Sequence, residues 1–360
     1  MSHQKHHYSR KNWAPIEVIG LVIVLIALIA LLFAPNSLSQ LFDLTINEVF
    51  NVVVPIFLTG TVGIAIIVSV ILGRILERLG FTDGLIRLFV PIMKWMHINP
   101  TVIIPSIYNI LGDINAAGKI AAPVLEKANA TEAEQKIAVA TMIQSPQSFA
   151  TFVLGLIALS AAGINLFPII ILSIFVPLIV VPFILSRTIY RDTRKVDLHE
   201  LPRFTPNTKP LETLFQSAKE GTELLLLVII PAVAAVFFVI GVLKFMGVWE
   251  LIESILTILL NYLSIDASSG ILSILAAPTL AVAQLAEYSN TISPGIVVGS
   301  FVIANSGLPL SVLFGQMPAT WRACSSLREK DVIEAALIGL VIRFTTAWIL
   351  GFIITPFLVV

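Results

Sequence analysis

The sequence has few charged residues and almost no cysteine. Of its 360 residues, 12% are Asp, Glu, Lys or Arg, one is a cysteine, and 57% are hydrophobic. A soluble domain carries about 25% charged residues, so a soluble enzyme is excluded. A single cysteine also excludes an intrachain disulfide and a cysteine-based metal cluster, and we interpret Cys324 as a small buried hydrophobe.

Sequence motifs of the common enzyme and nucleotide-binding classes are absent as well. We find no nucleotide-binding glycine loop, no zinc-protease helix motif and no serine nucleophile elbow. Histidines do not share a face of any expected span, so no metal site is predicted. The formal net charge is zero and no basic patch indicates a nucleic-acid partner. An intramembrane enzyme is a remote alternative, in which Asp113 or Glu287 acts as a base.

Long apolar runs dominate what is present. About 20 apolar residues cross the ~30 Å hydrocarbon core of a bilayer. Seven runs reach this length: Ile16–Ala34, Ile46–Leu72, Ile137–Leu159, Ile164–Leu185, Leu224–Phe245, Ile292–Met317 and Val332–Leu358. The first is too long for a signal peptide and lacks a cleavage site, so we interpret it as a retained helix. The sequence therefore predicts an all-α integral membrane protein in contact with the lipid bilayer.

Two further apolar stretches are interrupted by Gly, Pro and polar residues, and we predict that each forms a re-entrant helical hairpin. They are residues 101–125 and 267–290. Interrupted backbone survives at membrane depth where protein or a water-filled cavity satisfies its polar groups. An amphipathic helix is expected before each hairpin, at Asp83–Met96 and at Trp249–Leu263, lying along the membrane surface or packed against the spans.

Basic residues orient these spans. They cluster near Lys5, Arg74, Arg191 and Arg328, and all four clusters fall on one side when seven spans are threaded in order. The positive-inside rule makes that side the cytoplasm, with the N-terminus inside and the C-terminus outside. The first hairpin then enters from the cytoplasm and the second from outside. The fold class predicted is thus an inverted repeat in the cytoplasmic membrane.

The same division sets the domain boundaries. We expect an N-terminal tail and first helix at 1–45, a first repeat at 46–186, a cytoplasmic linker at 187–217 and a second repeat at 218–360. Two short segments of the first repeat also have echoes in the second. Met96-His97-Ile98-Asn99 echoes Leu263-Ser264-Ile265-Asp266, and Ile120-Ala121-Ala122-Pro123-Val124-Leu125 echoes Leu275-Ala276-Ala277-Pro278-Thr279-Leu280.

Polar residues concentrate in the hairpins and in the interrupted spans that follow them, and we predict that they bind a substrate. They are Asn109, Asp113, Asn115, Lys119, Gln144, Ser145, Gln147 and Ser148 in the first half, and Gln284, Glu287, Tyr288, Asn290, Asn305 and Ser306 in the second. For any one residue the structural alternative is interhelical packing, with Pro146 and Pro309 merely kinking helices. Their matched places in both halves favour function.

Lys119 has two interpretations of equal weight. It either neutralises Asp113, which lowers the cost of burying both charges, or attracts an anionic ligand near helix ends.

Several of these residues carry a resemblance to the nucleoside-recognition gate domain superfamily, which includes concentrative nucleoside transporters and spore-maturation membrane proteins. Gly118-Lys119-Ile120-Ala121-Ala122-Pro123 is similar in frame to the Gly-Gln-Thr-Glu-Ala-Pro motif of the first hairpin in those transporters, which sets Lys119 at the Gln position. Ala283-Gln284-Leu285-Ala286-Glu287-Tyr288 resembles their Asn-Glu-Phe-Val-Ala-Tyr motif. Ala304-Asn305-Ser306-Gly307-Leu308 resembles Ala-Asn-Phe-x-Ser in the next span.

The resemblance implies a secondary transporter or facilitator that moves a small polar solute, anionic or nucleoside-like, by alternating access. It implies no enzymatic activity and no cofactor, with coupling to Na+ or H+ left open, and a homo-oligomer is expected. The alternative is a non-transporting gate-domain protein in an envelope or sporulation assembly.

Overall fold

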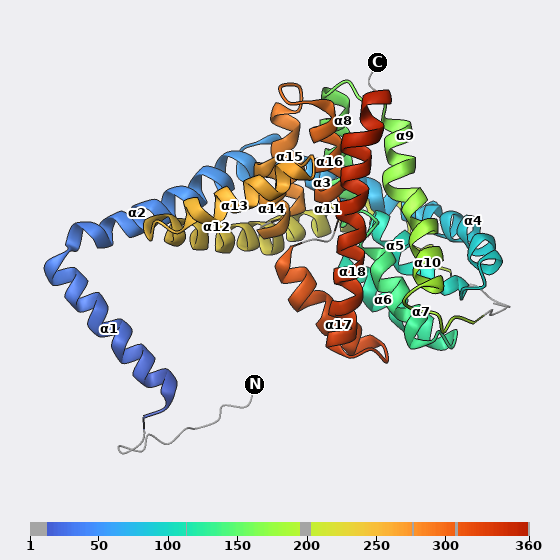
Figure 1. Cartoon of the computed structure of the whole chain (residues 1–360), viewed down its shortest axis with the longest axis horizontal. Coiled ribbons are helices and arrows are strands. Elements are labelled where there is room, and N and C mark those ends of the chain that lie inside the picture. Colours follow the sequence, from blue (N-terminus) through green and yellow to red (C-terminus); the bar gives the residue numbers. More distant parts are fainter. Residues whose placement is uncertain (1–12, 113, 195–202, 276, 307–308, 359–360) are drawn as a thin grey trace.

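The computed structural model of the chain describes residues 13–112, 114–194, 203–275, 277–306 and 309–358, without the side chains of Asn115 and Ala116. In these parts every element of regular secondary structure is helical, which confirms the predicted class (Figure 1). The helices form a body of upright helices, including α18, and an arm that extends sideways from it.

One continuous helix forms the axis of the arm. It runs from Pro210 to Phe245 and comprises α11 (Pro210–Glu223), a π-helical turn (Leu224–Ile229) and α12 (Ile230–Phe245). At 1.5 Å per residue its 36 residues span about 54 Å, more than the ~30 Å hydrocarbon core, and the polar α11 at its start accounts for the excess length. Its start at Pro210 lies inside the linker predicted at 187–217.

A second helical segment of the arm consists of α2 (Pro35–Val52), a π-helical turn (Val53–Leu58) and α3 (Thr61–Arg78). It packs along the first, α2 against α12 and α3 against α11. The run Ile46–Leu72, expected to be one span, is therefore wrong in its bounds: the chain is interrupted at Thr59 and Gly60. The proline at 55 lacks the N–H that would continue the α-helical ladder, and the helix ends within one turn of it.

The remaining expected spans are present as helices, and two of them, 137–159 and 292–317, are each divided into shorter helices. The bounds are α1 Pro15–Phe33, α7 Glu132–Met142, α8 Phe149–Ala161, α9 Leu166–Ile170 with α10 Val176–Arg187, α16 Pro294–Ala304, α17 Met317–Cys324 and α18 Glu329–Trp348. By length and apolar composition five of the described helices could each cross a membrane, or six when one bent pair is counted as a span. The interruptions predicted at Gln144–Ser148 and from Asn305 to Pro309 are present as the breaks between α7 and α8 and after α16.

Both predicted hairpins and both amphipathic helices are confirmed. The first hairpin consists of α5 (Ile104–Leu111) and α6 (Ile114–Lys127), and follows α4 (Phe81–Trp95). The second hairpin consists of α14 (Ala267–Leu275) and α15 (Pro278–Tyr288). It follows α13, Trp249–Tyr262, after a bend of 111°.

The internal repeat is visible in matched backbone at the entrance of each hairpin. His97 and Ser264 both have positive φ, 62° and 57°. The residue two positions further donates its backbone N–H to a side chain about 35 residues downstream, from Asn99 to Glu134 Oε1 (2.9 Å) and from Asp266 to Ser300 Oγ (2.8 Å). The echo between Met96–Asn99 and Leu263–Asp266 therefore marks equivalent structure.

The second echo does not mark equivalent structure. Ile120–Leu125 lies in the middle of α6, whereas Leu275–Leu280 includes the end of α14 and the beginning of α15. An Ala-Ala-Pro sequence is compatible with either place, since proline is tolerated at the first turn of a helix and, with a kink, inside one.

Candidate functional site

The two interrupted spans touch at their breaks. The first break follows Met142, the last residue of α7, and the second follows Ala304, the last residue of α16. Between them, the backbone N–H of Gln147 donates to the carbonyl oxygen of Asn305 at 2.9 Å. The end of one half-span is thereby held directly against the end of the other.

Asn109 of the first hairpin joins this junction. Its amide nitrogen donates to Ser145 Oγ at 3.1 Å, and the Ser145 hydroxyl donates to the carbonyl of Met142 at 2.7 Å. Asn109, Ser145 and Asn305 are all fully buried. The structure therefore brings together Asn109, Gln144, Ser145, Gln147, Asn305 and Ser306, six of the predicted residues.

An arginine that sequence reasoning missed occupies the centre of the junction. Arg343 of α18 is fully buried. Its Nε donates to the carbonyl of Val302 (2.9 Å) and to Ser306 Oγ (2.5 Å), and its Nη1 donates to the carbonyls of Gln144 (2.9 Å) and Ser173 (2.5 Å). An arginine inside an apolar run is itself a signal, because ionisable groups at membrane depth are rare and mark functional sites.

Gly339, one turn before Arg343, brings α18 against the end of α7. A Cβ at this glycine would lie 2.6 Å from the carbonyl oxygen of Ala140, so a larger residue would force the helices apart. The close approach lets the Gln144 amide donate to the Gly339 carbonyl at 2.8 Å. Gln144 is thus held by α18 at both its backbone and its side chain.

The junction holds more polar capacity than it uses. Buried atoms without a hydrogen-bond partner in the described parts include Asn109 Oδ1, Gln144 Oε1, Gln147 Oε1, both amide atoms of Asn305 and Arg343 Nη2. Each such group costs about 1–3 kcal/mol when buried without a partner. A cluster of them in one place therefore marks the junction as a candidate binding site for water, an ion or a polar ligand.

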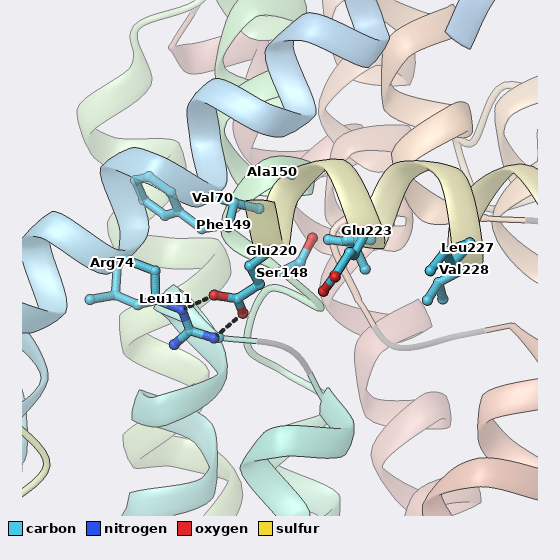
Figure 2. A pocket seen from close by; sticks show the side chains of 12 residues that line it. Val70, Arg74, Leu111, Ser148, Phe149, Ala150, Glu220, Glu223, Leu227 and Val228 are labelled. Carbon is cyan, nitrogen blue, oxygen red and sulfur yellow. Dashed lines mark hydrogen bonds and ion pairs between the residues drawn. The ribbon is translucent and has the colours of Figure 1, made fainter. Parts of the chain in front are cut away.

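A cavity of about 280 Å³ lies beside the junction, between the arm and the first hairpin (Figure 2). The arm contributes Val70 and Arg74 of α3 together with Glu220, Glu223, Leu224, Leu227 and Val228 of the long helix; the hairpin tip contributes Leu111 and Gly112, and the first break contributes Ser148, Phe149 and Ala150. The cavity volume is near the lower end of the range for ligand sites, roughly 300–1,000 Å³, which suits a small solute.

Arg74 is the only cation of this lining and it is already paired. Its Nε and Nη2 donate to the two carboxylate oxygens of Glu220 at 2.9 and 2.5 Å, as Figure 2 shows, and its Nη1 donates to Glu77 at 2.6 Å. Glu223 adds a second carboxylate to the lining. Glu223 is itself paired with Lys219 of the same helix at 3.7 Å. Among the lining residues alone, two carboxylates stand beside one cation.

The other predicted residues of the first half lie apart from one another. Ser148 lines the cavity, whereas Lys119 is exposed on α6, beyond the hairpin tip at Gly112 rather than in it. No carboxylate among the described residues forms an ion pair with Lys119. Asp113 and the side chain of Asn115 lie outside the described residues, so the predicted pairing of Lys119 with Asp113 stays a prediction.

In the second hairpin, the predicted residues lie near its base, away from the junction. Tyr288 donates its hydroxyl to Asp266 Oδ2 at 2.7 Å, and Gln284 accepts from Ser268 Oγ at 3.3 Å. Glu287 and Asn290 are exposed.

The tip of the second hairpin reaches the site through a residue that was not predicted. Thr279 at the start of α15 shares a hydrogen bond with Thr151 of α8 (3.1 Å), and Thr151 shares another with Ser148 (2.9 Å). The second hairpin is thereby connected to the cavity wall.

The inverted repeat, the two re-entrant hairpins and the paired breaks define a helical membrane protein with a transporter-like fold. Several solved structures to which the chain is similar are of CNTnw, and their matches extend over nearly the whole chain. CNTnw in an inward-facing, substrate-bound state matches with a TM-score of 0.62 and 14% identity, over 94% of this chain and 86% of that chain. A CNTnw variant in an intermediate state matches with a TM-score of 0.61 and 16% identity, over 95% and 88%.

A CNTnw variant in an outward-facing state matches with a TM-score of 0.58 and 14% identity, over 94% of this chain and 86% of that chain. No protein-family model matches the sequence, and no curated protein does so. The distant relation to concentrative nucleoside transporters, predicted from the hairpin motifs, is confirmed at the level of the fold.

Proposed function

We propose that this protein is a secondary transporter or facilitator that moves a small polar solute across the cytoplasmic membrane by alternating access. The observation that carries the proposal is the position of the cavity. One wall belongs to the arm, and the other belongs to a hairpin tip and a broken helix. Carriers with inverted repeats bind substrate at such an interface and expose it by moving one wall against the other.

The charges of the lining select the kind of solute. Glu220 and Glu223 outnumber Arg74 among the lining residues, so an anion would meet net repulsion, which solvent weakens because both carboxylates are about half exposed. A neutral solute can accept a hydrogen bond from Ser148 and lie against the ring of Phe149. We therefore favour neutral or cationic polar solutes, nucleosides among them, over the anionic solute that Lys119 suggested.

Uptake into proteoliposomes, together with a thermal-shift screen of the purified protein, tests this function. The screen covers nucleosides, nucleotides, organic acids and metal ions. We expect a neutral or cationic compound to raise the melting temperature and to be taken up. An organic acid as the strongest ligand would contradict the charge argument. If no compound stabilises the protein and none is taken up, the non-transporting assembly protein is favoured instead.

A pair of variants on one helix adds the control. Glu223→Gln removes a carboxylate that lines the cavity, whereas Glu212→Gln changes an exposed carboxylate of the same helix outside it. We expect Glu223→Gln to need about ten times more ligand for the same thermal shift, which corresponds to about 1.4 kcal/mol of binding free energy. Glu212→Gln should leave the ligand response unchanged.

A further inference from the structure

The Arg343 guanidinium is a buried charge with no counter-ion in the described parts of the chain. All four of its acceptors are neutral oxygens, three backbone carbonyls and the Ser306 hydroxyl. Burying an ion without a counter-ion costs several kcal/mol, and arginine in a membrane span is correspondingly rare. A packing role is served by an apolar residue at no such cost, so the charge itself needs an explanation.

Three of the acceptors lie where two broken helices end. The Gln144 carbonyl follows the last turn of α7, and Val302 and Ser306 belong to the last turn of α16 and the break after it. Each helix end carries a partial negative charge of about half an electron, which attracts cations. The fourth acceptor, the Ser173 carbonyl, lies in the π-helical turn that precedes α10.

This donor set is the kind that binds a free cation in other carriers. Where transporters have discontinuous helices, unwound carbonyls and the C-terminal ends of half-helices coordinate Na+ or H+. Here the same kinds of oxygen, from both repeats, converge on a guanidinium that is part of the protein. Arginine suits the task, since its planar group is weakly hydrated and offers several donors in fixed directions.

We propose that Arg343 is a resident cation at the junction of the broken helices, and that it takes the place of a dissociable coupling cation there. The protein then has its two half-spans neutralised in every state, and it is stable without Na+. The replacement of a coupling cation rests on the proposed transport function. The occupancy of the junction by a fixed charge does not depend on it.

Melting of the purified protein in sodium chloride and in choline chloride, at equal ionic strength, tests this. We expect the wild-type melting temperature to be the same in both salts. Arg343→Gln removes the charge and frees carbonyl oxygens, so this variant is expected to melt lower in choline. Sodium, or free guanidinium at a concentration that leaves wild type unchanged, should restore part of the loss. Arg343→Lys keeps a cation, and should stay close to wild type and insensitive to sodium.

Arg322→Gln is the matched control, because Arg322 is exposed and pairs with Glu329 at the surface. It should show neither the loss nor the restoration. Saturable stabilisation of wild type by sodium over choline would overturn the proposal. So would an Arg343→Gln variant that folds and responds to neither cation, or an Arg343→Lys variant as unstable as the neutral one. If Arg343→Gln does not fold, the wild-type and lysine measurements still decide. These measurements need no substrate, so an absence of uptake would remove the transport function and leave this inference standing.

Discussion

The backbone N–H of Gln147 and the carbonyl of Asn305 form a 2.9 Å hydrogen bond that joins the two repeats at their interrupted spans. Both atoms are free to pair because each helix has just ended there. Arg343 then binds the last carbonyls of both half-spans, so one side chain and one backbone bond hold the junction together. Loosening this junction should therefore be costly even where no ligand is involved.

Gly339→Ala tests the close approach of α18 to α7. The added Cβ would lie 2.6 Å from the Ala140 carbonyl and 3.0 Å from its Cα, so backbone must move. We expect a loss of about 1–3 kcal/mol of unfolding free energy. Gly84→Ala is the control: it has nothing within 4 Å of the new Cβ and lies in an exposed part of α4, so it should stabilise by roughly 0.5–1 kcal/mol. Melting in detergent measures both; equal effects would refute the close packing.

The two ion pairs of Arg74, with Glu77 and with Glu220, are expected to contribute unequally to the free energy of unfolding. Arg74→Gln leaves Glu77 without its ion-pair partner, and Glu77 is 7% exposed, so we expect a loss of about 2 kcal/mol. Glu220→Gln removes a half-exposed partner and should cost less than about 1 kcal/mol. The double variant Arg74→Gln/Glu77→Gln should recover most of the loss. Unfolding midpoints for the three variants check this, and a failure of the double variant to recover would show that Glu77 is not stranded.

The extended segment after residue 202 should detach from α4 in acid. Asp83 accepts hydrogen bonds from the N–H groups of Phe204 (2.9 Å) and Thr205 (3.0 Å) and from the Thr205 hydroxyl. Burial acts to raise the pKa of Asp83, but these bonds outweigh it and lower the pKa below its ordinary value of 3.8. A lowered pKa stabilises the docked state above the unfolded value, and this stability is lost as the pH falls through the folded value.

Hydrogen exchange at Phe204 and Thr205, corrected for the pH dependence of the intrinsic rate, measures this detachment. Protection should be constant at neutral pH and fall below about pH 4. Asp83→Asn should lose protection already at neutral pH, because the carboxylate acceptor is removed. Protection that is unchanged in this variant would contradict the assigned role of Asp83.

Local features were predictable from the sequence to within a few residues. The two hairpins and the helices before them were found because glycine, proline and polar residues interrupt apolar runs at those places, and such punctuation acts locally. The paired breaks at Gln144–Ser148 and Asn305–Ser306 were found for the same reason. Their direct contact, through Gln147 and Asn305, depends on tertiary packing and was not predicted.

What the sequence did not predict depends on packing between distant segments. Arg343 was passed over because it stands in an uninterrupted apolar run, whereas polar residues were sought only at interruptions. Glu220 and Glu223 lie in the last turn of α11, whose partner, α3, is chosen by tertiary contact. The motif Gly118–Pro123 lies within α6, after the turn at Gly112, and a motif match carries no information about where a hairpin turns.

The inverted orientation of the two repeats is tested at the ends of the hairpins. Lys127 ends the second helix of the first hairpin and Asn290 follows that of the second, and both are exposed. On a background in which Cys324 is replaced by serine, single cysteines at these two positions should react with an impermeant maleimide from opposite sides of the membrane. Asn207 lies in the linker that was predicted to be cytoplasmic, so it serves as the cytoplasmic reference and should be labelled from the same side as Lys127. Labelling of Lys127 and Asn290 positions from the same side of intact cells would end the inverted arrangement, whatever the substrate proves to be.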